Sequence, residues 1–108
     1  MIIKEQLPHQ AFYAVIFSSV KSDDLEGYTE MDEKTLKLAQ EQKGYLGYEA
    51  VADDKRSIFI SYWESMEDIR VWGEHAVHKM AKAQAGRWYK RYLSQICRVE
   101  SSRYWEQD

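Results

Sequence analysis

The chain has 108 residues, of which 44% are hydrophobic and 31% charged, and its formal net charge at pH 7 is −3. This length and composition predict a single domain over residues 1–108, with a core of about residues 11–104 and an N-terminal arm of residues 1–10. Acidic and basic residues are interspersed, which argues against a nucleic-acid-binding protein and against binding to an anionic membrane surface.

The sequence contains no recognisable targeting or membrane-spanning segment. Glu5 and Gln6 stand too early for a signal peptide, and the longest apolar run, residues 11–17, is too short to cross a bilayer. We therefore expect a cytoplasmic protein. Its single cysteine, Cys97, cannot form an internal disulfide, and we expect it to be a small buried side chain rather than a catalytic thiol.

The predicted elements begin with a strand over residues 11–20. Apolar side chains lie on both faces of its pleat: Phe12, Ala14 and Ile16 on one, and Tyr13, Val15 and Phe17 on the other. This pattern is typical of a strand that is covered on both sides. A loop then leads into a helix predicted from Tyr28 to Lys43, which ends at Gly44 because glycine readily adopts the conformation of a helix C-cap.

Two further strands are predicted over residues 46–53 and 57–64, joined by a polar hairpin turn. The sequence that follows, from Ser65 to Asp68, fits the start of a helix whose first-turn amides are capped by a hydroxyl. This second helical region is predicted from Met66 to about Lys90, and Gly73 is a candidate break within it.

A final strand is predicted over residues 93–103, which completes the order βαββαβ. That order predicts an α+β, ferredoxin-like fold, with a four-stranded antiparallel sheet and its helices on one face. Since the first and third strands carry apolar side chains on both faces, the uncovered face needs a partner. We expect a homodimer through the sheet face; the alternative is a monomer with an aromatic open face.

Several segments resemble the antibiotic-biosynthesis-monooxygenase (ABM) domain family. The similarity includes the opening strand and the turn at residues 44–49, and its most specific part is Phe59 to Glu67 followed by Ile69, Trp72 and His78. The resemblance extends over residues 12–100. It implies a dimeric α/β barrel with a pocket between the sheet and the helices of each subunit. Enzymes of this family oxidise polycyclic phenols or anthrones without metal or flavin, or they degrade haem.

His78 and His75 are the candidate catalytic residues. They lie three residues apart, and His75 is also three residues from Trp72, so that a helix would place them close together. Imidazole titrates near neutral pH, and either histidine could orient a phenol or accept its proton. In an unbroken helix His78 would point outward, and a break at Gly73 would change that. The alternative is a pair of histidines with routine hydrogen bonds.

We expect no metal site, because two histidines at this spacing need a third ligand; the alternative is a site completed by Glu74 or by a residue from elsewhere in the chain. The candidate walls of a substrate pocket are aromatic, and the alternative for each of them is core packing. They are Trp72, Trp63, Phe17 and Trp88.

Haem is an unlikely cofactor for this chain. Haem-degrading members of the family use an asparagine on the first strand and a histidine ten residues after the tryptophan. This chain contains no asparagine, and Lys82 stands ten residues after Trp72. The leading hypothesis is a cofactor-independent monooxygenase that oxidises a small electron-rich aromatic compound, with molecular oxygen as co-substrate. The alternative is a non-catalytic small-molecule-binding module of the same fold, or, less favoured, a haem-binding protein.

Overall fold

The structure, a computed structural model, describes residues 11–108 except for the side chains of Ala76 and Val77. The predicted N-terminal arm, residues 1–10, lies outside the described residues. The elements follow the order β1 (Phe12–Lys21), α1 (Tyr28–Ala39), β2 (Tyr45–Ala52), β3 (Arg56–Trp63), α2 (Met66–Gly73), α3 (Ala76–Ala83), α4 (Ala85–Trp88) and β4 (Tyr89–Val99). The predicted α+β, ferredoxin-like fold is confirmed.

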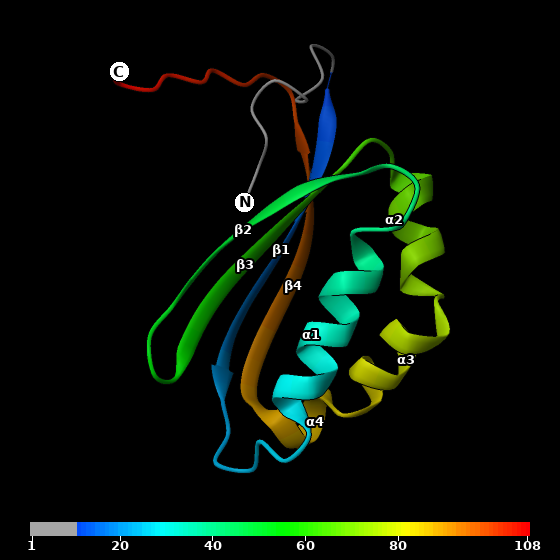
Figure 1. Cartoon of the computed structure of the whole chain (residues 1–108), viewed down its shortest axis with the longest axis vertical. Helices are drawn as coiled ribbons and strands as arrows, with labels where there is room; N and C mark the ends of the chain where they lie inside the picture. The colour runs from blue at the N-terminus through cyan, green and yellow to red at the C-terminus, as the bar shows by residue number, and fades with distance from the viewer. Residues whose placement is uncertain (1–10) are drawn as a thin grey trace.

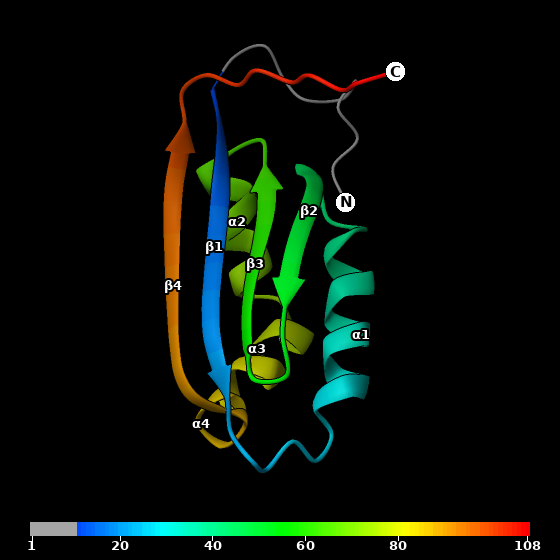
Figure 2. The ribbon, with the colours of Figure 1, turned by 90° about the vertical axis from the view of Figure 1, so that its left-hand side faces the viewer.

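The four strands form one antiparallel sheet in the order β2-β3-β1-β4. The helices cover one face of this sheet (Figure 1), and Figure 2 shows the opposite face with no helix in front of it. Tyr13 pairs with Trp63 across β1 and β3. Cross-strand partners share a face, and Trp63 packs against residues of α1 and α2. The odd-numbered residues of β1 therefore face the helices. Phe12, Ala14 and Ile16 share the other face, as predicted, and it is the face without helices.

The predicted second helix, residues 66–90, is three short helices instead. The first break follows Gly73, where the amides of Glu74 and His75 bond to carbonyls three residues back and α2 ends. Glycine is a poor helix former, which agrees with the candidate break. The second break, at Gln84, was not predicted. It precedes a single turn of helix, α4, that leads directly into β4.

Three boundaries also differ from the prediction by four residues, one of them the end of β4, which lies at Val99 rather than at residue 103. The helix α1 ends at Ala39 rather than Lys43, because the chain tightens into turns in which Gln42 N–H donates to the Ala39 carbonyl. Gly44 then adopts a left-handed φ of 85°. The strand β4 begins at Tyr89, four residues before the predicted start, because Tyr89 pairs with Lys21 beyond a register shift in β1.

The core lies between α1, α2 and the covered face of the sheet. Trp63, Trp72 and Ala39 form a buried cluster against which Val15, Leu38, Tyr45 and Ile69 pack. Trp63 is 1% exposed, and its Nε1–H donates a hydrogen bond of 2.9 Å to Ser61 Oγ. A buried indole thus has its one polar group satisfied, as a stable core requires.

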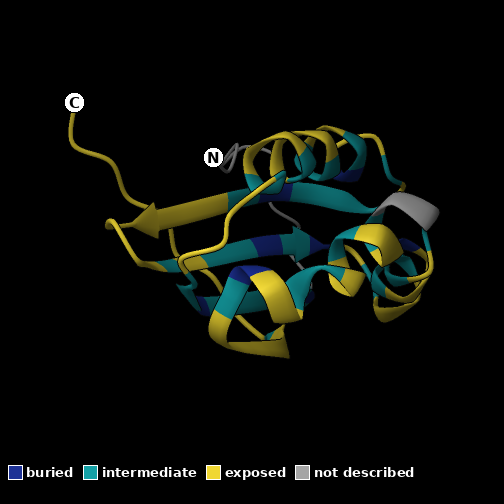
Figure 3. Cartoon of the chain, turned by 90° about the horizontal axis from the view of Figure 1, so that it is seen from below, coloured by how far each residue is buried: buried dark blue, intermediate teal, exposed yellow. Residues whose placement is uncertain are grey.

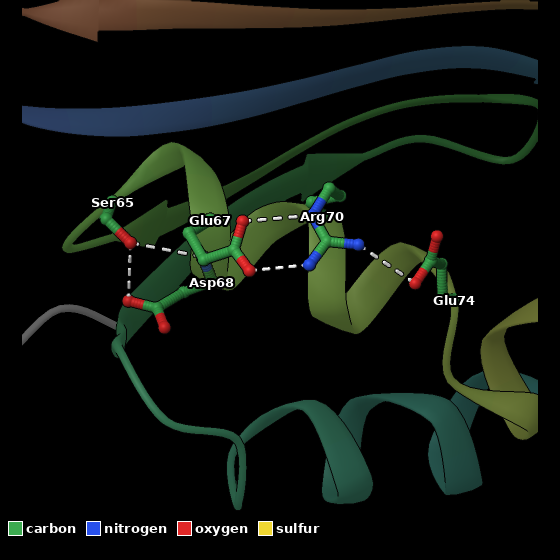
Figure 4. Close-up of polar contacts among 5 residues, drawn as sticks. All are labelled: Ser65, Glu67, Asp68, Arg70 and Glu74. Carbon is green, nitrogen blue, oxygen red and sulfur yellow. Dashed lines mark hydrogen bonds and ion pairs between the residues drawn. The ribbon is translucent and has the colours of Figure 1, made fainter.

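The predicted capping pattern at the start of α2 is confirmed (Figure 4). Ser65 Oγ accepts from the Asp68 N–H at 3.1 Å and donates to Asp68 Oδ2 at 2.8 Å. One turn later Arg70 forms ion pairs with Glu67 at 2.5 Å and with Glu74 at 3.1 Å. These ion pairs are exposed, so the cap is the larger local contribution to stability.

The open face carries exposed apolar side chains. Ile58 is 46% exposed, Leu93 54% and Val51 70%. Every residue from 49 to 56, at the β2–β3 hairpin, is exposed (Figure 3). The expectation that Cys97 is buried was wrong: its thiol is exposed, because Cys97 lies on the edge strand β4, in which residues 90–98 are all exposed.

Candidate functional site

The break between α2 and α3 brings both candidate histidines onto Trp72. The imidazole of His78 stacks on the indole of Trp72, with ring centroids 4.8 Å apart and an interplanar angle of 14°. The ring of His75 lies 5.1 Å away at 41°. In an unbroken helix His78 would have pointed outward, so the break at Gly73 determines the geometry of this group. Trp72 is 7% exposed and fixes the histidines to the core.

A hydrogen bond assigns the tautomer of His78. Its Nδ1 lies 3.1 Å from the carbonyl oxygen of Trp72. Because a carbonyl oxygen only accepts, Nδ1 carries the proton and donates it, and Nε2 of the neutral ring has a free lone pair. The sequence alone could not indicate this tautomer, since the bond exists only because α3 folds back on the end of α2.

The protein also favours the neutral form of His78. Burial lowers the pKa of His78 below its usual range, and the positive charge of Lys82 and the neighbouring His75 add to that decrease. The hydrogen bond to the Trp72 carbonyl acts in the opposite direction. At pH 7 the side chain is therefore predominantly neutral, and its Nε2 is a proton acceptor.

Trp63 lies beneath this group, in the same buried cluster as Trp72. With 1% of its surface exposed, it is a core side chain that supports Trp72. Tyr45 meets the Trp63 ring edge-on at 5.3 Å, and burial raises the pKa of Tyr45 to about 12.

Among the described residues, the buried Tyr45 hydroxyl and Thr35 Oγ1 have no hydrogen-bond partner. Such atoms require an explanation, and a bound water or ligand is the usual one. Sequence analysis singled out neither residue.

Phe17 belongs to a different aromatic group on the covered face of the sheet. Its ring stacks on Tyr92 at 5.4 Å and meets Tyr89 edge-on at 5.3 Å. Tyr89 in turn contacts Tyr28 of α1 at 6.0 Å. Burial raises the pKa of Tyr89, and its hydrogen bond with Tyr28 adds to the increase. Phe17 thus contributes to packing between the sheet and α1.

Trp88 lines a separate pocket of about 330 Å³ between α1 and α4. The lining residues are Gly27, Glu30, Met31, Lys34, Gln84, Arg87 and Trp88. Of the six residues singled out from the sequence, Trp88 alone lines it. The structure therefore brings together Trp63, Trp72, His75 and His78, and places Phe17 and Trp88 elsewhere.

In the part of the chain that the structure describes, no group of three or more histidine, cysteine, aspartate or glutamate side chains is arranged to hold a metal ion. None of the described helices is long and apolar enough to cross a membrane.

The chain is similar in sequence to a known protein family and to a protein of Bacillus subtilis. The family model for antibiotic biosynthesis monooxygenase matches residues 11–84. Protein YqjZ of Bacillus subtilis (strain 168), itself uncharacterized, is 42% identical over 104 residues, which cover 94% of this chain and 90% of YqjZ.

Two solved structures share the fold at low sequence identity. One, from Shewanella oneidensis, has a TM-score of 0.73 and 9% identity, covering 88% of this chain and 96% of its own. The other is SnoaB from Streptomyces nogalater, described as a cofactor-independent oxygenase. It has a TM-score of 0.66 and 9% identity, covering 91% of this chain and 99% of its own. At these identities the likeness shows the fold alone.

Proposed function

Because this chain belongs to the antibiotic biosynthesis monooxygenase family, we propose that it oxidises a small electron-rich aromatic compound with molecular oxygen, without a metal or an organic cofactor. One observation carries the proposal: His78 is held against Trp72 in its neutral form, with Nδ1 bonded to a carbonyl and Nε2 free to accept a proton. The fold it shares with SnoaB, described as a cofactor-independent oxygenase, supports the same chemistry.

In the proposed reaction His78 is the base. Its Nε2 accepts a proton from a phenol, or from the carbon of an anthrone, and the resulting anion is rich enough in electrons to reduce oxygen directly. For an anthrone, the CH₂ carbon becomes a carbonyl; one atom of O₂ is incorporated, and the other leaves as water with the two hydrogens. No external reductant is needed. The buried indole of Trp72 keeps the base in position and excludes water from one face of its ring.

The proposed active unit is a homodimer formed through the open face of the sheet. Exposed Val51, Ile58 and Leu93, with the half-buried Ile16 and Ile60, make this face apolar. Figure 2 shows that no helix covers it. A second copy would bury these side chains, and two such sheets packed face to face would form a dimeric α/β barrel.

Oxygen uptake tests the proposed oxidation. The purified protein is incubated with a panel of anthrones and quinols in an oxygen electrode, and the active compound is then used with variants. We expect His78→Gln to lower the rate by about 10²–10⁴-fold, the usual contribution of a general base. Lys79→Gln, an exposed change on the same helix, is the matched control and should keep full activity. No uptake with any compound, or equal rates for wild type and His78→Gln, would contradict the proposal.

The alternative of a small-molecule-binding module is favoured by a different observation. The pocket of about 330 Å³ beside Trp88 lies apart from the histidines, and a ligand there would not meet the proposed base. Saturable binding of an aromatic ligand with no oxygen consumption would favour this alternative. Haem binding stays the least favoured possibility, since nothing in the structure restores the absent asparagine and the histidine replaced by Lys82.

A further inference from the structure

The pocket between α1 and α4 has a rigid aromatic floor. Trp88 is only 4% exposed, and its Nε1–H donates to the Glu26 carbonyl at 2.9 Å. Its ring also meets Tyr28 edge-on at 5.5 Å. The indole is therefore fixed from two sides before any ligand arrives, which reduces the entropy lost on binding. Met31 adds an adaptable apolar wall from α1.

The wall of the pocket is charged. Glu30 and Lys34 stand one turn apart on α1, and Arg87 comes from α4. Arg87 is already engaged: its guanidinium donates to the Glu26 carbonyl, lies 3.6 Å from Asp24 and sits 5.7 Å from the Trp88 ring. Lys34, by contrast, forms neither an ion pair nor a side-chain hydrogen bond with any described residue.

One basic group at the pocket has no counterion among the described residues. Asp24 balances the charge of Arg87, whereas Lys34 forms no ion pair with any described residue. A ligand anion therefore finds in Lys34 an ammonium with no protein partner among the described residues. A volume of about 330 Å³ is at the small end for ligand pockets, which suits a compound of one or two rings.

We propose that this pocket binds a small planar aromatic carboxylate. The ring lies against Met31 and the small exposed part of the Trp88 indole, and the carboxylate accepts a charge-assisted hydrogen bond from Lys34 Nζ. Glu30 limits affinity for the anion, because the two carboxylates repel each other. The site is distinct from the group around His78, since neither Trp72 nor either histidine lines it. It therefore does not depend on the proposed oxidation.

Isothermal titration calorimetry with three probes of one shape tests this site. The probes are 2-naphthoate, 2-naphthalenemethanol and 2-naphthylmethylammonium, which share the naphthalene ring and carry an anionic, a neutral and a cationic group. We expect the naphthoate to bind about tenfold more tightly than the alcohol, as one hydrogen bond between charged groups implies, and the ammonium to bind most weakly. Equal affinities for all three, or no saturable binding of naphthoate at millimolar concentration, would overturn the proposal.

Variants locate the binding. Lys34→Gln should weaken naphthoate binding about tenfold and leave the alcohol unchanged, while Glu30→Gln should strengthen naphthoate binding. Lys37→Gln, on the same helix but outside the lining, is the matched control and should bind like wild type. His78→Gln should also bind naphthoate normally, which separates this site from the oxidation. If Lys34→Gln binds naphthoate as tightly as Lys37→Gln, the proposed site is wrong.

Discussion

Replacing Ser61 with alanine tests whether Trp63 is a core side chain that supports the candidate site. Ser61 Oγ accepts the only polar hydrogen of the Trp63 indole at 2.9 Å, and Trp63 is 1% exposed. Water therefore cannot replace the lost acceptor. Leaving a buried N–H donor without a partner costs about 1–3 kcal/mol, and the variant should be destabilised by that amount.

This loss of unfolding free energy corresponds to a decrease in the melting temperature. An unfolding entropy of about 2.1 cal/mol/K per residue over the chain gives about 0.23 kcal/mol/K, so Ser61→Ala should melt roughly 4–13 °C below wild type. Thermal unfolding followed by circular dichroism, at equal protein concentrations, measures this difference. Ser94→Ala, an exposed change on the same face, is the matched control and should stay within about 0.5 kcal/mol of wild type. If Ser61→Ala melts with the control, Trp63 does not depend on this bond.

Two further predictions concern the turn into β2 and the titration of His78. Gly44→Ala should lower the free energy of unfolding, measured in urea, by more than about 1 kcal/mol, because φ is 85° at this residue and a Cβ would overlap the Asp68 carboxylate. Gly86→Ala is the control and should leave the free energy of unfolding unchanged, because a Cβ at Gly86 would meet no atom within 4 Å. His78 has a lowered pKa when folded, so protonation favours the unfolded chain. The contribution of neutral His78 to the free energy of unfolding should be fully present above about pH 6.5, and it should be lost as the pH falls through the pKa of the folded state. His78→Gln should reduce that decrease; an unchanged pH profile would contradict the burial of the imidazole.

The fold could be predicted because its signals are local and repetitive. Runs of apolar and aromatic residues placed β1 and β3 within one residue of their observed ends. Because side chains alternate between the two faces of a strand, the sequence also indicated which side chains of β1 share a face, and the pairing of Tyr13 with Trp63 agrees with it. Ser65 signalled the start of α2 because a hydroxyl cap depends only on residues within one turn.

The candidate site could be predicted only in part, because its geometry depends on long-range contacts. Sequence spacing brought Trp72, His75 and His78 together, but a continuous helix would have turned His78 away from the indole. The second break, at Gln84, has no glycine or proline at that position. We attribute it to Trp88, whose indole N–H bonds to the Glu26 carbonyl 62 residues away in the chain. No local pattern contains such a contact, so the sequence could not show that Trp88 lines a pocket apart from Trp72 and the histidines.

The proposed function depends on the tautomer and the pKa of His78, and long-range ¹H–¹⁵N NMR measures both directly. The spectrum of uniformly ¹⁵N-labelled protein is recorded from about pH 5 to 8, with His78→Gln to assign the resonances. We predict a proton on Nδ1, an unprotonated Nε2 and a pKa below the usual value of about 6.5. A proton on Nε2 of the neutral ring, or a pKa above 6.5, would show that His78 is not held as a neutral base against Trp72.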